Sequence, residues 1–263
     1  MNIIVLVKQV PDTESLLELD TGNALVKTEN VKWIVNPYDE YAIEEALQIK
    51  ENLGDAKVTV LSAGPKRSEA ALRTALAMGA DEAVLIDDPA VEGSDALGVA
   101  RLLAAALKQI PHDLILAGMR AVDDDGYQVP AAVAEYLDTP LITTVTKVTL
   151  EDGKILCEQT VEGGVLEVAG ELPLVITTQK GINLPRYASL PNIMKAKKKP
   201  LTPMPLADLG LSPEQVGAGA AMTALISVDY PLERKPGILV SGESPQEMAA
   251  ELVRLLREEA KVL

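Results

Sequence analysis

The chain has 263 residues, is 48% hydrophobic and carries a formal net charge of −15. This length allows one large or two small domains, and the acidic balance argues against general binding to nucleic acid or anionic membranes. Cys157 is the single cysteine and His112 the single histidine, which excludes an intramolecular disulfide, a cysteine metal cluster and a multi-histidine metal site. No basic segment precedes the apolar residues 3–7, and no apolar run approaches transmembrane length, so we expect a cytoplasmic protein that is not inserted in a membrane.

The first half of the chain alternates short apolar runs, typical of buried strands, with amphipathic stretches typical of helices. We expect strands at residues 3–7, 58–63, 83–86 and 114–117, and helices at residues 39–51, 68–78, 94–109 and 130–137. Ser68 and Ser94 are expected to cap the second and third helices. Alternation of strands and helices with short joints predicts an α/β fold with a mostly parallel, doubly wound sheet.

The second half has a different pattern. Asp152-Gly153, between the apolar runs 147–150 and 154–160, predicts a β-hairpin insertion, and residues 165–168 and 174–178 are further strands, the last returning to the main sheet. Frequent prolines then predict an extended arm over residues 180–235 with a short helix in it. Ser244-Pro245 begins a last helix with its proline at the favoured first position. Its expected apolar stripe is Met248, Leu252, Leu255 and Leu256.

Several chemistry-bearing motifs are missing. A dinucleotide-binding turn needs glycines directly after the first strand, but residues 8–12 contain none. The sequence also has no Walker A stretch and no GxSxG nucleophile elbow.

Residues 118–130 are the main candidate for a ligand site. They begin at the carboxyl end of the strand at 114–117, and ligands of open α/β sheets bind at such strand ends. The carboxylates of Asp123–Asp125 would repel a phosphate, so we expect a phosphate to meet the backbone N–H groups of residues 128–131 at a helix N-terminus. The aspartates then suit ribose hydroxyls or adenine amino hydrogens. The alternative is that the Asp-rich loop is a plain turn.

Two further joints between a strand and a helix, residues 35–39 and 62–65, end at the same edge of the predicted sheet. Gly64 in the second joint permits close approach of a backbone. Together with the Asp-rich loop, these joints could wall one pocket.

Residues 190–200 combine apolar side chains with four lysines. One interpretation is a helix, capped by Asn192, with Ile193 and Met194 in the core and a solvated lysine face. The other is a docking element, in which an exposed leucine fills a partner's pocket and contributes about 1.5–3 kcal/mol. The lysines would then steer an acidic partner.

The run from Pro185 to Lys199, Pro-Arg-Tyr-Ala-Ser-Leu-Pro-Asn-Ile-Met-Lys-Ala-Lys-Lys-Lys, resembles the signature of electron-transferring flavoprotein beta subunits. Asn36-Pro37, residues 62–65, residues 73–81 and the loop at Asp123–Asp125 extend the resemblance over nearly the whole chain.

The resemblance implies an adenine-nucleotide alpha-hydrolase-like fold and an electron carrier with no bond-making chemistry of its own. It implies a heterodimer in which an alpha subunit holds most of the FAD and this subunit holds a structural AMP. Electrons would come from flavin dehydrogenases such as acyl-CoA dehydrogenases and leave to a membrane quinone oxidoreductase. Residues 1–180 would form the nucleotide-binding domain, and residues 181–263 a recognition loop and a C-terminal arm that contacts the alpha subunit.

The resemblance also assigns sites by position. The AMP site falls on Leu6, Asn36, Pro37, Tyr38, Asp39, Ala63, Arg120, Ala121, Val122, Asp123, Asp124, Asp125, Gly126, Tyr127, Gln128, Val129, Pro130 and Ala131. The partner-binding residues are Leu190, Pro191, Ile193, Met194, Lys195, Lys197, Lys198 and Lys199. The chain departs from the family at Val129 and Pro130, where some members have a hydroxyl residue and a glycine, and at Thr13, where an aromatic residue can face the flavin.

Two alternatives stay open. A sister group of bifurcating flavoproteins has a similar beta subunit that binds a second FAD in place of AMP and oxidises NADH. Those members usually replace the Leu-Pro-Asn-Ile-Met-Lys stretch and carry Gly-Asp-Thr where this chain has Asp124-Asp125-Gly126, which favours the AMP type. The other alternative is a nucleotide-binding regulatory module of related fold, which needs no lysine-rich docking arm.

Overall fold

The computed structural model describes residues 1–20, 22, 25–28, 30–151, 154–233 and 236–263. The chain forms two compact units, Met1–Ser227 and Val228–Leu263.

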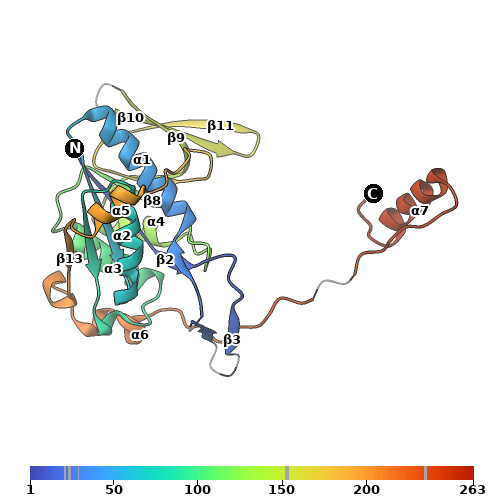
Figure 1. Cartoon of the computed structure of the whole chain (residues 1–263), viewed down its shortest axis with the longest axis horizontal. Coiled ribbons are helices and arrows are strands. Elements are labelled where there is room, and N and C mark those ends of the chain that lie inside the picture. Colours follow the sequence, from blue (N-terminus) through green and yellow to red (C-terminus); the bar gives the residue numbers. More distant parts are fainter. Residues whose placement is uncertain (21, 23–24, 29, 152–153, 234–235) are drawn as a thin grey trace. The chain divides into compact units, whose positions relative to one another are not determined.

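A large mixed sheet forms the centre of the first unit (Figure 1). Among the described residues it has nine strands in the order β11-β10-β9-β12-β8-β1-β6-β7-β13. The strands are β1 (Asn2–Leu6), β6 (Lys57–Ala63), β7 (Glu82–Ile86), β8 (Leu114–Gly118), β9 (Leu141–Glu151), β10 (Lys154–Val161), β11 (Gly164–Gly170), β12 (Leu174–Thr178) and β13 (Leu201–Pro203). All neighbouring pairs are parallel except β9–β10 and β10–β11, which are antiparallel.

Two short antiparallel ribbons lie outside this sheet. They pair β2 (Gln9–Pro11) with β5 (Trp33–Val35), and β3 (Glu18–Asp20) with β4 (Leu25–Lys27). The α-helices in the described part of the first unit are α1 (Pro37–Leu53), α2 (Glu69–Met78), α3 (Ala96–Leu107), α4 (Val129–Leu137), α5 (Leu190–Ala196) and α6 (Gly217–Ala220). Short 3-10 helices are η1 (Lys66–Ser68), η2 (Pro89–Val91), η3 (Leu206–Leu209) and η4 (Pro213–Gln215).

Alternate residues of β1 face opposite layers of helices, as expected for side chains on a strand. Ile3 and Val5 belong to one buried cluster with residues of α1 and α2, whereas Ile4 and Leu6 belong to a second with residues of α3 and α4. The sheet is therefore covered on both faces, which confirms the predicted doubly wound, mostly parallel α/β fold. Among the described residues, the carboxyl ends of β1, β6 and β8 lie at one edge, where α1, α3 and α4 begin.

The predicted hairpin insertion is also present. β9 and β10 pair in antiparallel register on either side of the expected Asp152-Gly153 turn, which itself lies outside the described residues. β12 returns to the main sheet between β8 and β9, as predicted.

The predicted arm over residues 180–235, extended with one short helix, contains α5 but also further short helices and a strand. Leu201–Pro203 forms β13, which pairs in parallel with β7 at the sheet edge. A three-residue strand between prolines gives no readable period in the sequence, and an edge strand tolerates proline.

Two predicted helix caps are displaced. Asp95, not Ser94, caps α3, because its Oδ1 accepts a hydrogen bond from the Gly98 N–H at 2.9 Å. Ser189, not Asn192, caps α5, where its hydroxyl accepts from the Asn192 N–H. In both cases the sequence offered two adjacent or nearby polar residues that can cap, and backbone geometry selected between them.

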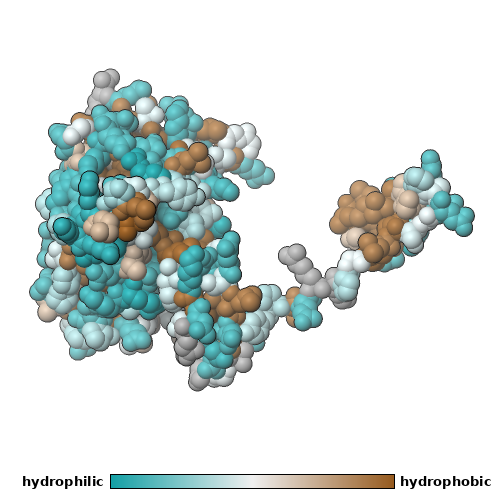
Figure 2. Space-filling model, viewed as in Figure 1, coloured by the Kyte–Doolittle hydropathy of each residue, from teal (hydrophilic) through white to brown (hydrophobic). Residues whose placement is uncertain are grey.

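The second unit contains α7 (Pro245–Glu258), which begins at its predicted proline after the Ser244 cap. Met248, Leu252 and Val253 are exposed on this helix within the unit, where Figure 2 shows a continuous apolar surface. No helix in the described part of the chain is long and apolar enough to cross a membrane.

Candidate functional site

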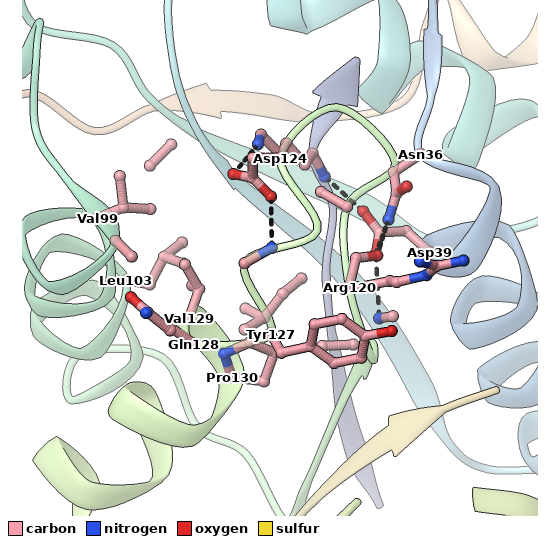
Figure 3. A pocket seen from close by; sticks show the side chains of 18 of the residues that line it. Asn36, Asp39, Val99, Leu103, Arg120, Asp124, Tyr127, Gln128, Val129 and Pro130 are labelled. Atoms are coloured by element: carbon pink, nitrogen blue, oxygen red, sulfur yellow. Dashed lines mark hydrogen bonds and ion pairs between the residues drawn. The ribbon is translucent and has the colours of Figure 1, made fainter. Parts of the chain in front are cut away.

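A pocket of about 270 Å³ opens at the carboxyl edge of the sheet. Its floor is formed by the ends of β1, β6 and β8, and its walls by the start of α1, the first turns of α3 and the loop that leads into α4. In Figure 3, Val99 and Leu103 of α3 lie on the opposite side of the pocket from Asn36, Asp39 and Arg120. The pocket is thus lined by an apolar wall and a polar wall.

The polar wall is organised around the buried carboxylate of Asp39. Its Oδ2 accepts a hydrogen bond from the Lys8 backbone N–H at 2.7 Å, and its Oδ1 accepts from Asn36 Nδ2 at 2.9 Å and from the Gly118 N–H at 3.0 Å. Burial raises the pKa of Asp39 to about 7, although the three N–H donors oppose that shift. This one side chain therefore ties the ends of β1 and β8 to the first turn of α1.

Asn36 fastens the Asp-rich loop to the same frame. Its Nδ2 also donates to the Arg120 carbonyl at 2.9 Å, and its Oδ1 accepts from the Val122 N–H at 3.2 Å. Gly118 is required beside it, because a Cβ at this position would lie 2.4 Å from Asp39 Oδ1. The loop can approach α1 this closely only because Gly118 has no side chain.

The three aspartates of the loop each have a cationic partner. Lys8 Nζ lies 2.8 Å from Asp123 Oδ1 and 2.9 Å from Asp124 Oδ2, and Arg120 Nη1 lies 2.9 Å from Asp125 Oδ2. Burial alone would lower the pKa of Lys8, but the two carboxylates outweigh burial and raise it. The expected repulsion between these aspartates and a phosphate is therefore reduced inside the site, a balance that the loop sequence alone did not reveal.

Arg120 also organises the aromatic side chains at the pocket. Its Nη2 donates to the Tyr38 hydroxyl at 2.9 Å, and its guanidinium lies 4.9 Å from the Tyr38 ring centroid and 5.8 Å from that of Tyr127. Its Nε is buried without a hydrogen-bond partner among the described residues. A polar ligand that reaches this nitrogen would satisfy a donor that otherwise costs free energy.

The first turn of α4 borders the pocket. Gln128 and Val129 line it, and they belong to the helix N-terminus, where the first N–H groups have no partner within the helix. Such an N-terminus attracts anions. Pro130 lacks an N–H, so the donors come from its neighbours in the chain.

The pocket brings together most, but not all, of the residues predicted for it. It is lined by Leu6, Asn36, Asp39, Ala63, Arg120, Ala121, Asp124, Gly126, Tyr127, Gln128, Val129 and Pro130. Pro37, Tyr38, Val122, Asp123, Asp125 and Ala131 lie outside the lining. Among these, three residues contact side chains that line the pocket: Tyr38 and Asp125 contact Arg120, and Asp123 contacts Lys8.

Gly118 and Met119, which begin the predicted ligand segment 118–130, also line the pocket. The sequence did not indicate one wall of the pocket, and the further lining residues are Val7, Lys8, Leu61, Ser94, Asp95, Ala96, Val99, Leu103 and Ala117. The group at 94–103 comes from α3 and the two residues before it, which follow β7. A signal was present, because the rule that ligands bind at carboxyl ends of parallel strands applies to this joint as much as to the others.

The second predicted region, residues 190–200, is absent from the pocket lining, and it and the residues just before it carry exposed apolar side chains. Leu184, Tyr187 and Leu190 are 89%, 99% and 79% exposed. Ile193 and Met194 are also exposed, so the interpretation that placed them in the core is wrong, and Ala196 is the buried residue of α5. Figure 2 shows apolar surface at the position of α5, surrounded by hydrophilic surface.

The four lysines of this region differ in their surroundings. Lys195, Lys197 and Lys198 are exposed, whereas Lys199 Nζ donates to the Leu76 carbonyl at 3.0 Å and the Ala80 carbonyl at 2.5 Å. Lys199 thus caps the carboxyl end of α2, and burial lowers its pKa. Its charge is used within the fold.

Comparison with known proteins identifies the class to which this fold and pocket belong. Residues 24–209 match the family model described as the electron transfer flavoprotein domain. The chain is 44% identical over 266 residues, covering 100% of both chains, to the electron transfer flavoprotein subunit beta of Bacillus subtilis, and 37% identical over 259 residues, covering 98% of both, to that of Bos taurus. It is also 38% identical, over 98% of both chains, to the caffeyl-CoA reductase-Etf complex subunit CarD of Acetobacterium woodii.

The chain therefore belongs to the electron transfer flavoprotein family, and within that family it is a beta subunit.

Proposed function

We propose that this beta subunit forms a heterodimer with an alpha subunit that holds most of the FAD, and that it keeps an AMP in the pocket at the sheet edge. The heterodimer carries electrons from flavin dehydrogenases, such as acyl-CoA dehydrogenases, to a membrane quinone oxidoreductase. The subunit acts as an electron carrier rather than as an enzyme. One observation carries the nucleotide part of the proposal: the pocket joins an anion-attracting helix N-terminus to an apolar wall and a polar wall.

The residues present fit a mononucleotide. The N–H groups at the start of α4 suit the phosphate, and the Asp-rich loop suits ribose hydroxyls or adenine amino hydrogens. Val99 and Leu103 offer apolar contacts to a base, and Arg120 Nε is a buried donor in need of an acceptor. A volume of about 270 Å³ lies just below the range of about 300–1,000 Å³ typical of small-molecule sites, which favours a mononucleotide over a dinucleotide.

The residues outside the pocket are assigned to partners. We place the nucleotide-binding domain in residues 1–180, and the recognition loop and the arm for the alpha subunit in residues 181–263. The exposed Leu190, Pro191, Ile193 and Met194 suit an apolar pocket of a dehydrogenase. Lys195, Lys197 and Lys198 suit an acidic rim, whereas the engaged ammonium of Lys199 removes it from direct contact.

One observation favours a second candidate. The relative named as a caffeyl-CoA reductase-Etf complex subunit matches this chain over nearly its full length, which keeps a bifurcating subunit with a second FAD and NADH oxidation in view. Two features favour the AMP type: the Asp124 carboxylate in the pocket, which pairs with Lys8, and the small volume of the pocket. A regulatory nucleotide-binding module would instead purify without any flavin-bearing partner.

The deciding experiment co-expresses the chain with its alpha subunit, denatures the purified complex and identifies the released nucleotides by chromatography and mass spectrometry. One FAD and one AMP per heterodimer is the expected result. Two FAD and no AMP would replace the proposal with the bifurcating form, and NADH would then be tested as the reductant. Recovery of the chain without an alpha subunit or a flavin would favour the regulatory module.

A further inference from the structure

The docking region defined by residues 184–195 presents its apolar side chains to solvent but is fastened at both ends. Tyr187 is 99% exposed and Leu190 is 79% exposed. Several large apolar side chains exposed close together are an informative surface feature, whereas a single one is not. A segment with so little burial has few contacts of its own to fix its shape. Its geometry must therefore come from the residues that flank it.

The first fastening is an ion-pair cluster on α1. Arg186 Nε and Nη2 lie 2.8 and 2.9 Å from the two carboxylate oxygens of Glu44, and Nη1 and Nη2 lie 2.5 and 3.1 Å from those of Glu51. The Arg186 backbone N–H also donates to Glu44 Oε2 at 3.1 Å. Side chain and backbone of the residue before Tyr187 are thus both fixed to one helix.

The inner half of this cluster is buried. The Glu44 side chain is 5% exposed, whereas that of Glu51 is 58% exposed. Burial alone would raise the pKa of Glu44, but hydrogen bonds from Arg186 and Gln48 outweigh burial and lower it. Bidentate pairs between arginine and carboxylate restrict direction as well as distance, which a lysine ammonium does not.

Asn183 adds a contact to the same helix, since its Nδ2 donates to the Tyr41 carbonyl and to Glu45 Oε2, each at 3.0 Å. At the other end, Arg73 of α2 donates from Nη1 to the carbonyls of Ala196 and Lys199, each at 2.9 Å. The exposed residues are therefore attached to α1 before them and to α2 after them, and these two helices cover the same face of the sheet.

We propose that Arg186 is a positioning residue for partner docking: its attachment to Glu44 and Glu51 holds Tyr187 and Leu190 in a fixed outward geometry before a partner arrives. This inference rests on the proposed function, because it takes a flavin dehydrogenase as the partner. A loop that is already ordered loses less conformational entropy on binding, so preorganisation raises affinity without any new contact.

The test uses the complete heterodimer and two variants. In both, the buried Glu44 carboxylate still has a cation as its partner. Arg186→Lys retains the cation but removes the planar fork, and Glu51→Gln removes the exposed half of the cluster. Glu158→Gln is the matched control, since Glu158 forms an ion pair with Lys147 on the hairpin, within the described residues. Urea unfolding and reduction of the flavin by dithionite check that fold and flavin are unchanged.

Two readouts are needed. In steady-state reduction by an acyl-CoA dehydrogenase, Arg186→Lys is expected to raise the KM for the heterodimer about tenfold and Glu51→Gln about threefold, with kcat unchanged because the formed complex makes the same contacts. Hydrogen exchange of the amides in residues 187–193 is expected to become faster in both variants and to stay as in the wild type in Glu158→Gln.

An unchanged KM in both variants, or unchanged exchange in residues 187–193, would overturn the proposal. A fall in kcat with no change in KM would also count against it, since that places the effect after docking. If the wild-type heterodimer is not reduced by any dehydrogenase offered, the proposed function fails. The exchange experiment then still decides whether Arg186 fixes the loop.

Discussion

In the pocket, groups from distant parts of the chain form hydrogen bonds and ion pairs with one another. In residues 184–195, by contrast, large apolar side chains that are close in sequence are exposed to solvent. Asp39 alone receives hydrogen bonds from Lys8, Asn36 and Gly118, and the charges of the Asp-rich loop are paired within the site. The docking region and the residues directly after it leave several apolar side chains and Lys195, Lys197 and Lys198 exposed. The difference indicates that the first region is built to hold a ligand steadily and the second to meet a partner and release it.

The largest expected effect comes from breaking the pocket frame. Asp39→Ala removes the acceptor of two buried N–H donors, on Asn36 and Gly118, and of the partly buried Lys8 N–H, at a cost of about 1–3 kcal/mol for each buried group. We expect a lower thermal midpoint of the heterodimer and loss of its bound nucleotide. The measurements are a thermal melt and nucleotide analysis, with the exposed Asp55→Ala as the control. A variant that keeps both stability and nucleotide would show that Asp39 does not hold the frame.

The same residue gives a pH dependence. The pKa of Asp39 is raised from 3.8 to about 7 by burial, so between these values the folded state binds more protons than the unfolded state. Stability from this group is fully present below about pH 4 and is lost as the pH rises to about 7. Asp39→Asn should remove that part of the pH dependence in urea unfolding. Identical slopes for the wild type and the variant would contradict it.

At the docking region, Leu190→Ala is expected to weaken association with a dehydrogenase by about 1.5–3 kcal/mol while stability stays unchanged, because the side chain is exposed. Stopped-flow reduction of the heterodimer at several concentrations measures the effect. Val165→Ala, at an exposed apolar position of β11, is the matched control. Equal rates for Leu190→Ala and the wild type would remove Leu190 from docking.

A smaller effect tests charge pairing in the pocket. Lys8→Met leaves Asp123 and Asp124 without their cation. Their uncompensated charge then repels the phosphate of the nucleotide more strongly, and we expect the affinity for AMP to fall about fivefold, or about 1 kcal/mol. Calorimetry on the nucleotide-depleted heterodimer measures it. Lys32→Met is the control, because Lys32 pairs with Asp12. A tighter affinity in Lys8→Met would reverse the assigned role of this pair.

The smallest effect concerns steering by the exposed lysines. Replacing Lys195, Lys197 and Lys198 together by glutamine should slow association at low ionic strength and flatten its dependence on salt, since exposed charges are screened beyond about 8 Å at physiological ionic strength. Lys199 is left in place because it caps α2. Association rates across a salt series give the answer. A wild-type rate that does not change with salt would exclude steering.

The difference between the pocket and the docking region also explains which parts of the fold and of the site could be predicted from the sequence. The strand and helix alternation, the hairpin, and the edge at which the pocket opens follow from local pattern and from general rules of parallel sheets. The docking region was recognisable because its residues are contiguous. Its exposed Ile193 and Met194 were not decided by pattern, since apolar residues at helical spacing more often face a core.

Long-range pairing is what the sequence could not supply. Nothing near Lys8 in the chain indicates that its ammonium reaches Asp123 and Asp124, or that Arg186 would meet Glu44. These contacts depend on how strands and helices far apart in sequence are placed. The edge strand β13 was missed for a related reason, because only its pairing with β7 makes those residues a strand.

In and just before α5, the residues that are exposed for contact with other proteins are different from the residues that attach the segment to the fold. Leu190–Lys195 are exposed, while Ala196 packs into the core and Arg186 is tied to α1. Substitutions in the exposed stretch therefore change the surface offered to other proteins at little cost in stability. Selection can retune the choice of redox partner there one residue at a time, and a stretch exchanged between relatives should be accepted as long as both attachment points are kept.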